Sequence, residues 1–197
     1  MAYLSKPLRI MKRILILLLA LMPVIASAQK VSRNEIDEKG VRHIETDIRI
    51  MYVGRSPHGC KLSYIKENDK EAYTLMLAIN DQPSRWTSKK GQKLMMKDVN
   101  GKVYEIISTG TSQSTIGRGS NGVVYQTIVA YTIPMDKADV FANGLVKLRI
   151  EYTYTDNNKT DLLDIDVPAD MTNYLKKAHK NISKAIPLPA TVDKSVF

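Results

Sequence analysis

Apolar and polar side chains alternate with a period of two along much of this chain, and that period limits the possible folds more than any other feature. The clearest example is residues 145–154, where Leu148, Ile150, Tyr152 and Tyr154 alternate with polar or charged neighbours. Successive side chains of a β-strand point to opposite faces, so this pattern predicts a strand with one buried and one solvated face. Strands of this kind are typical of antiparallel sheets.

Seven further segments, rich in β-branched and aromatic residues, carry the same strand signature. They are residues 44–53, 61–66, 72–79, 93–99, 102–107, 122–133 and 161–167. Segments 72–79 and 122–133 are apolar at both odd-numbered and even-numbered positions, which predicts central strands covered on both faces. Asn100-Gly101 predicts a two-residue hairpin turn with a pair of positive φ angles, and residues 67–70 predict a second hairpin loop.

Two segments have the signature of helices. Residues 135–144 end at Asn143-Gly144, which predicts a short helix with Asp136 as its N-cap. In residues 169–186 apolar residues recur at helical spacing opposite a face of lysines. The predicted architecture is therefore mostly β: an antiparallel two-sheet β-sandwich, with the short helix between late strands and a C-terminal amphipathic helix across a sheet face or edge. One curved sheet wrapped around the last helix is the alternative.

The first 28 residues have the layout of a secretory signal peptide. They hold four basic residues and no acidic one, followed by the apolar run 14–25 and the small residues 26–28. A helix that spans a bilayer needs about 20 apolar residues, and this run is shorter and contains Pro23. The sequence therefore predicts export to the periplasm or outside the cell, with cleavage between Ala28 and Gln29. No transmembrane segment is expected after cleavage.

The rest of the chain has the composition of an ordinary folded domain. The 44% hydrophobic and 25% charged residues of the full chain exclude a disordered or collagen-like protein. Residues 29–40 are polar and aperiodic and are predicted to be a flexible lead-in, and residues 41–197 a single domain. The basic excess that remains without the leader favours an envelope glycan or another exported protein as partner, and no nucleic-acid motif is present. A solvated lysine face is the alternative.

None of the motifs that we tested predicts a catalytic residue, a metal site or a cofactor. Residues 117–122 match G-x-G-x-x-G, but a strand pattern follows them instead of the helix that a dinucleotide site needs, so a loop is predicted. The three histidines include no close pair, which zinc sites usually have. Residues 156–161 place oxygen ligands at alternate positions but lack the glycine and glutamate of an EF-hand loop, which favours a hairpin turn.

Cys60 is the only cysteine, so no intrachain disulfide is possible. His58 lies two residues earlier, and two strand residues span about 6.6 Å, so a catalytic pair would need a bent chain. A buried, unreactive thiol is the alternative. A hydrolase site built from His43, His58 or His179 with Cys60 or carboxylates nevertheless remains a hypothesis.

The order of elements in the second half of the chain resembles a known group of proteins. The segments that carry the resemblance are Lys90-Gly91-Gln92-Lys93-Leu94, Asn100-Gly101, Tyr131-Thr132-Ile133-Pro134 and Gly144-Leu145-Val146-Lys147-Leu148-Arg149. In this order they resemble a group of uncharacterised small secreted proteins of Gram-negative anaerobes. The resemblance covers residues 72–186 and implies a mostly β domain with a terminal helix and an exported location. It implies no catalytic residues.

Two loops rich in turn-forming and small polar residues, 81–93 and 108–122, form the predicted contact surface. The second is predicted to be the most mobile loop of the chain. Exposed strand tyrosines are expected to add to the surface, and for the single tryptophan packing under its loop is the alternative. The candidate ligand-binding residues are Arg85, Trp86, Arg118 and Tyr125. The predicted function is that of an exported non-enzymatic binding or envelope-associated module. A hydrolase-like enzyme and a structural subunit that uses β-strand addition are the alternatives.

Overall fold

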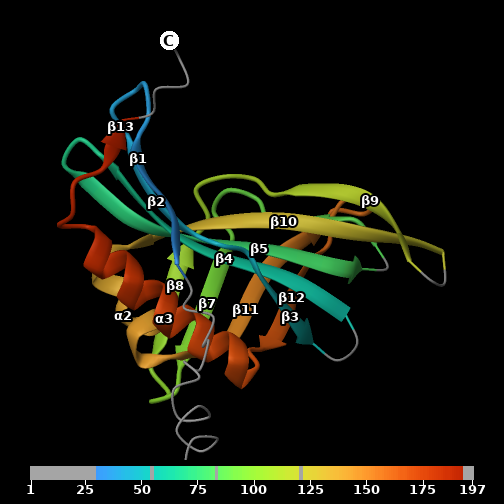
Figure 1. Cartoon of the computed structure of the whole chain (residues 1–197). Coiled ribbons are helices and arrows are strands. Elements are labelled where there is room, and N and C mark those ends of the chain that lie inside the picture. The colour runs from blue at the N-terminus through green and yellow to red at the C-terminus, as the bar shows by residue number, and fades with distance from the viewer. Residues whose placement is uncertain (1–29, 54–55, 83, 120–121, 193–197) are drawn as a thin grey trace, which may run out of the picture.

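A computed structural model describes residues 30–53, 56–82, 84–119 and 122–192 (Figure 1). The predicted signal peptide lies outside these residues. The strands are β1 (Val31–Ile36), β2 (Arg42–Thr46), β3 (Arg49–Val53), β4 (Ser56–Glu67), β5 (Lys70–Gln82), β6 (Trp86–Thr87), β7 (Lys93–Asp98), β8 (Val103–Ile107), β9 (Gln113–Gly119), β10 (Gly122–Pro134), β11 (Leu145–Tyr154), β12 (Thr160–Asp166) and β13 (Thr191–Val192). The helices are the 3-10 helix η1 (Met135–Lys137), α2 (Asp139–Asn143) and α3 (Ala169–Ala185).

The strands form two sheets, which confirms the predicted two-sheet, mostly β architecture. The large sheet has the order β13-β1-β2-β4-β5-β10-β9, and β3 pairs with β4 beyond the end of β2. The small sheet has the order β12-β11-β7-β8, and β6 pairs with β11. All pairs are antiparallel except that of β1 with β13. Both predicted helices are present, η1 and α2 between β10 and β11, and α3 after β12.

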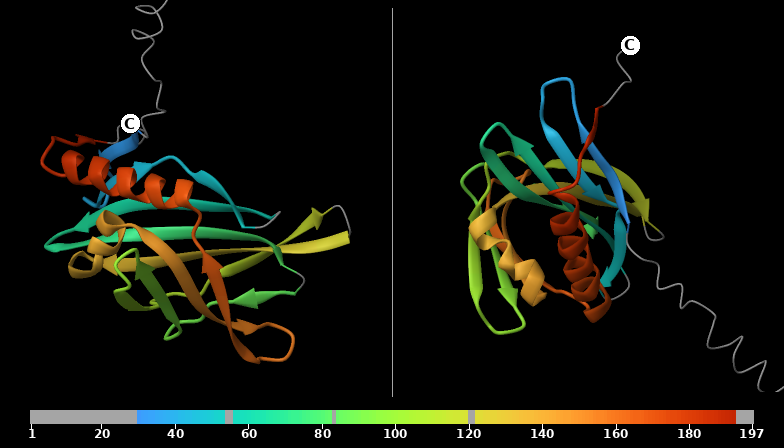
Figure 2. Two further views of the ribbon diagram at one scale, coloured as in Figure 1. Left: turned by 90° about the horizontal axis from the view of Figure 1, so that it is seen from below. Right: turned by 60° about the vertical axis from the view of Figure 1, so that its left-hand side comes forward.

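The core lies against one face of the large sheet. On β5 the side chains of Tyr73, Leu75, Leu77 and Ile79 are buried and point to this face, as the two-residue period requires. The small sheet covers this face along β5 and β10, and α3 covers it along β1 to β4 (Figure 2). The last helix therefore lies across a sheet face beside the second sheet, as predicted.

Helix α3 is held in place by its apolar stripe and by its C-terminal end. Met171, Leu175, Ala178 and Ile182 are buried, whereas the lysines of the opposite face are exposed. The guanidinium of Arg42 donates hydrogen bonds to the carbonyl oxygens of the last turn and beyond, at 2.9 Å for Ala185, 2.7 Å for Ile186 and 2.7 Å for Leu188. No helix within the described part of the chain is long and apolar enough to cross a membrane.

Two segments expected to be irregular are strands. Val31–Ile36, which we expected to be a flexible lead-in, forms β1, and Gln113–Gly119, which we expected to be part of a mobile loop, forms β9. Both lie toward the outside of the large sheet, where a strand can be polar on both faces. The polar side chains of β1 pair across to β2, as Arg33 does with Glu45 at 3.4 Å. Their strand character therefore comes from the neighbouring strand and not from alternation.

Other details also differ from the expectations. The predicted strand 44–53 is broken between Thr46 and Arg49 into β2 and β3. Asp136 does not cap the short helix, because Pro134 is the N-cap of η1 and makes no side-chain bond. The β7–β8 hairpin forms as predicted, but only Gly101 of its turn has a positive φ, at 85°.

The largest difference concerns the two strands predicted to be covered on both faces. The outward side of β10 is exposed at Ala130 and Thr132, and Ile128 there is 41% exposed. No described element lies over this face. The outward face of β5 and β10 is apolar in part because of small side chains such as Ala78 and Ala130. Such side chains can stay exposed and do not require a second covering layer.

Candidate functional site

The two predicted contact loops meet in the structure and are joined by backbone hydrogen bonds. The N–H of Ser112 donates to the carbonyl of Ser88 at 2.9 Å, and the N–H of Ser88 donates to the hydroxyl of Ser112 at 2.6 Å. At the other end, the N–H of Ser108 donates to the carbonyl of Gln92 at 2.8 Å. Ser88 and Ser108 are buried. Residues 108–112 are therefore held at a fixed position beside β10.

A groove of about 380 Å³ separates this segment from β10. Its first wall is residues 108–112, which are rich in hydroxyl groups. Its second wall is Ile128, Val129, Ala130 and Thr132 of β10. The groove is therefore polar along one wall and largely apolar along the other.

Beyond Ile128, β10 has no strand neighbour on the groove side among the described residues. The pairing of β9 with β10 runs from Gly119↔Gly122 to Gln113↔Ile128. On its other side, β10 stays paired with β5 as far as Pro134. The second half of β10 is therefore an open edge that faces the groove.

The hairpin at the start of β5 shows which backbone groups face the groove. Glu67 and Lys70 close a two-residue hairpin and so form a hydrogen-bonded pair, and such pairs alternate with non-bonded pairs along antiparallel strands. In this alternation, the even-numbered residues of β5 bond to β4, and its odd-numbered residues bond to β10. The partners of these odd-numbered residues are residues 129, 131 and 133 of β10, which therefore bond to β5. Ala130 and Thr132 therefore direct their N–H and C=O groups into the groove. Within the described part of the chain, no loop or turn residue makes a backbone hydrogen bond to either.

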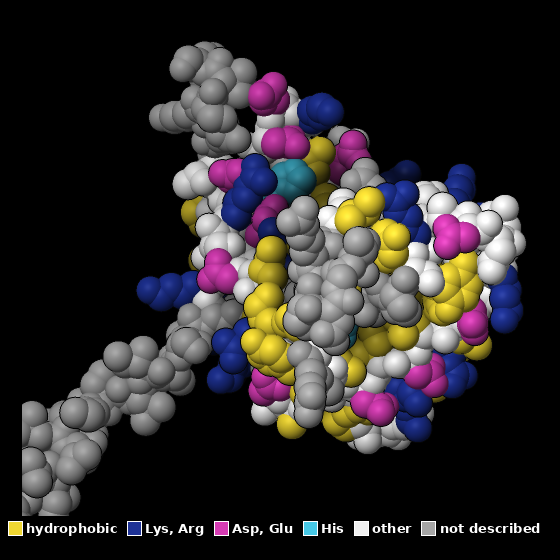
Figure 3. All heavy atoms as spheres, turned by 90° about the vertical axis from the view of Figure 1, so that its right-hand side faces the viewer, with side chains coloured by type: hydrophobic (Ala, Val, Ile, Leu, Met, Phe, Trp, Pro, Cys, Tyr) yellow, Lys and Arg dark blue, Asp and Glu magenta, His cyan; other side chains and the backbone are white. Residues whose placement is uncertain are grey.

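Two of the four predicted contact residues lie together. The guanidinium carbon of Arg85 lies 5.5 Å from the ring centroid of Tyr125, in a cation–π contact. Figure 3 shows the end of the molecule where β3, β5 and the β9–β10 hairpin project, with hydrophobic side chains around its middle and charged ones toward its rim. Arg118 lies on β9, but its side chain is outside the described set. A ligand-binding role for these three residues stays a prediction.

Trp86 is placed differently from a contact residue. Its side chain is 1% exposed and packs against Tyr152, with ring centroids 5.0 Å apart. Its indole N–H finds no acceptor among the described atoms. Burial favours the packing alternative for Trp86, because a ring with so little exposed surface offers almost nothing to a partner.

Most strand tyrosines are in the core and do not form the exposed surface that we expected. The buried ones are Tyr64, Tyr73, Tyr104, Tyr131 and Tyr152, whereas Tyr52 is 65% exposed. Buried hydroxyl groups have partners: that of Tyr64 donates to Glu71 at 2.5 Å, and that of Tyr131 lies 3.1 Å from the hydroxyl of Ser88. A tyrosine whose hydroxyl is bonded in this way can be buried at little cost.

The residues of the hydrolase hypothesis lie apart. His43 is on the outward face of β2, 3.1 Å from Asp37, whereas His179 is on α3 against the ring of Tyr73 at 5.1 Å. His58 is buried next to the far end of β5, where its Nδ1 accepts the N–H of Asn80 at 3.1 Å. The described structure therefore brings no two of the three histidines into one pocket.

Cys60 is buried in the core, and no metal-binding cluster is found in the part of the chain that the structure describes. Burial raises the pKa of the Cys60 thiol to about 12. A thiol with such a pKa carries almost no thiolate at neutral pH, so this environment favours the unreactive alternative. Among the described residues, no three histidine, cysteine or acidic side chains converge as metal ligands would.

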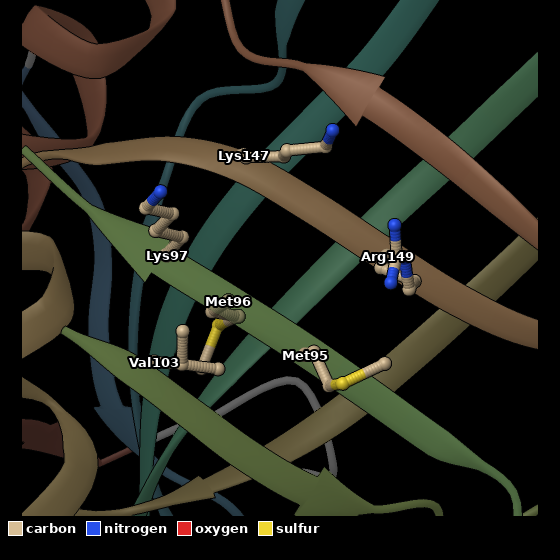
Figure 4. A pocket seen from close by; sticks show the side chains of 6 residues that line it. All are labelled: Met95, Met96, Lys97, Val103, Lys147 and Arg149. Carbon is tan, nitrogen blue, oxygen red and sulfur yellow. The ribbon is translucent and has the colours of Figure 1, made fainter. Parts of the chain in front are cut away.

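A second hollow, of about 260 Å³, lies on the outward face of the small sheet (Figure 4). We call it the Lys97 hollow. Lys97 and Met95 come from β7, Lys147 and Arg149 from β11, and Val103 from β8. Buried Met96 of β7 completes the lining, which therefore combines three cations with three apolar residues.

The two residues at the open edge were not predicted from the sequence. Ala130 and Thr132 lie in the long apolar run 122–133, which we interpreted as covered on both sides. Pro134 at the end of this strand is the one available signal, because proline is confined to edges, strand ends and bulges. The Lys97 hollow depends on strand pairing, because its lining residues on β11 are far from Lys97 in the sequence.

Comparison with known proteins does not assign the chain to a family. No protein-family model matches it, and no curated protein matches it with significant similarity.

Proposed function

We propose that this chain is an exported, non-enzymatic binding module that takes an extended segment of a partner protein into the groove beside β10. The segment would add a strand to the open edge. The observation that carries the proposal is the pair of residues Ala130 and Thr132, whose backbone groups face a preformed groove. Export rests on the signal-peptide pattern of the first 28 residues.

Residues 108–112 leave room for such a segment and offer it a second set of partners. A strand added to a sheet lies about 4.8 Å from its neighbour, and its main-chain groups supply most of the affinity. On its far side the segment would meet the hydroxyl groups of Thr109, Thr111 and Ser112. Four backbone groups at about 0.5–1.5 kcal/mol each give about 2–6 kcal/mol, which supports weak binding with a Kd between tens of millimolar and tens of micromolar.

The outward face of the large sheet indicates which partner segment would fit. Met76 lies opposite Ala130, and Ala78 lies opposite Ile128, so an apolar row runs across β5 and β10 to the groove. Alternate side chains of an added strand would continue this row. We therefore expect apolar residues at every second position of the segment. An envelope glycan has less support, because most tyrosines that could stack on sugar rings are buried.

Selection of displayed peptides tests this proposal. Peptides are selected on the wild-type protein, and their affinities for wild type, Thr132→Pro and Thr132→Val are then measured by calorimetry. Proline removes an N–H that faces the groove and leaves the bonds to β5, whereas valine keeps the N–H. We expect about tenfold weaker binding to T132P and a change of less than about twofold for T132V.

A second measurement keeps the test valid if T132P does not fold. Addition of a selected peptide to the wild-type protein should shift the amide resonances of Ala130 and Thr132. Equal binding to folded T132P, resonance shifts confined to other strands, or selection that yields no binding peptide would each contradict strand addition at β10.

A further inference from the structure

The Lys97 hollow places two like charges directly opposite each other. In the register of β7 and β11, Lys97 is the partner of Lys147, and Met95 is the partner of Arg149. Side chains that face each other across an antiparallel pair have Cβ atoms about 4.5–5.5 Å apart, and like charges there are destabilising. Figure 4 shows the side chains of Lys97, Lys147 and Arg149 standing on the same side of these strands.

The acidic residues nearby neutralise this charge only in part. Asp164 accepts two hydrogen bonds from Arg149, at 2.6 and 2.8 Å, and lies 3.3 Å from Lys147. Asp166 is 4.0 Å from Lys147, and its side chain is 92% exposed. Glu105, on the neighbouring strand, pairs with Lys93 at 3.1 Å. No described carboxylate forms an ion pair with Lys97.

Arg149 and Asp164 act as one neutral unit at the side of the hollow. Hydrogen bonds from Arg149 lower the pKa of Asp164 to about 2, so this carboxylate stays ionised. With Arg149 compensated in this way, the two lysines carry the remaining positive charge, of which exposed Asp166 offsets that of Lys147 in part. A single group with two negative charges would match them.

The remaining lining is apolar. Val103 lies beside Lys97 on the β8 side and is 57% exposed, and Met95 stands next to it on β7. A thioether and a branched alkyl group next to cations offer an apolar body a place to lie while its charged end reaches the lysines.

We propose that the Lys97 hollow binds a phosphate monoester carried on an apolar body. The phosphate would bridge the ammonium groups of Lys97 and Lys147, and the apolar part would lie on Met95 and Val103. A phosphate monoester carries close to two negative charges at neutral pH, which matches the two lysines, whereas a carboxylate carries one. This site is on a different sheet from the groove beside β10 and does not depend on it.

Titration of the isotope-labelled protein with hexyl phosphate tests the proposal, with amide resonances as the readout. We expect saturable shifts at Met95, Lys97, Val103 and Lys147, and weaker binding of inorganic phosphate, which lacks the apolar part. Lys97→Met should weaken binding by about tenfold, because it removes one charge-assisted contact. Lys90→Met is the matched control, since Lys90 is exposed and does not line the hollow. It should bind as wild type does.

The pH dependence and a lipid form of the ligand complete the test. Binding should strengthen as pH rises from about 5 to about 7, because the second phosphate proton leaves near pH 6. Vesicles with phosphatidic acid distinguish the sources: binding to these as well as to hexyl phosphate indicates a lipid headgroup, and binding to hexyl phosphate alone indicates a free ester. Equal affinity of K97M and wild type, or shifts away from the hollow, would overturn the proposal.

Discussion

Asp98 shows how one side chain organises a turn. It lies at the end of β7, is 1% exposed, and accepts hydrogen bonds from the N–H groups of Asn100 and Lys102, both at 3.0 Å, and from the side-chain amide of Asn143 at 2.9 Å. Burial opposes ionisation of this carboxyl group, yet these hydrogen bonds outweigh it and hold the pKa of Asp98 below its ordinary value. The carboxylate thereby ties the β7–β8 turn to α2.

The lowered pKa of Asp98 predicts a pH-dependent contribution to stability. A carboxyl group with a depressed pKa in the folded state stabilises the fold above its unfolded pKa, about 3.9, and this contribution is lost as pH falls through the folded pKa. Asp98→Asn should therefore lower the urea midpoint at pH 7 and reduce the difference in midpoint between pH 7 and pH 3. Exposed Asp156 offers the control, since D156N should leave both values unchanged. The same pH dependence in D98N as in wild type would contradict this role.

At the residue scale, local chemistry could be predicted and burial could not. Gly101 was expected to have a positive φ because a hairpin turn needs it, and it does. The burial of Trp86 depends on Tyr152, which is far away in the sequence. Most strand tyrosines are buried for the same reason, because the partners of their hydroxyl groups, such as Ser88 for Tyr131, come from other elements.

At the scale of elements, segments with their own period or stop signals were predicted well. Strand β11 has the predicted bounds, Leu145–Tyr154, and α3 ends one residue before the predicted position. The strands β1 and β9 were missed because their sequences contain no alternation. They are strands because β2 and β10 offer them a hydrogen-bonding edge.

The contact of Arg42 with the end of α3 predicts an effect on stability at the scale of secondary-structure elements. The last carbonyl groups of a helix have no partner within it, and Arg42 of β2 supplies one to Ala185, Ile186 and Leu188. Arg42→Lys keeps the charge but loses the planar fork, so the free energy of unfolding should fall by about 1–3 kcal/mol. Urea unfolding measures the change, and amide exchange should accelerate in the last turn of α3.

Arg85→Lys is the matched control for Arg42→Lys. Arg85 is exposed, and its contact with the ring of Tyr125 survives in part with an ammonium group. R85K should change the free energy of unfolding by less than about 0.5 kcal/mol. A loss in R42K no larger than that in R85K would show that Arg42 does not stabilise the end of α3.

At the scale of the whole molecule, the two-sheet architecture could be predicted but the open edge could not. Period and composition indicated two packed layers, because each sheet must bury one face. The order of strands decides which edge is left unpaired, and that order places β10 between β5 and a β9 that covers only its first half. The candidate site therefore follows from topology, with residues 108–112 of the second predicted loop supplying one wall of the groove.

The central claim is that the second half of β10 is an open edge whose backbone groups face the groove. Site-resolved amide hydrogen exchange of the unliganded protein tests it within a single strand. Ala130 and Thr132 should exchange about 100-fold faster than Val129, Tyr131 and Ile133, because the odd-numbered amides bond to β5 in the middle of the sheet. Equal protection of all five amides would show that the edge is already occupied and would contradict the account.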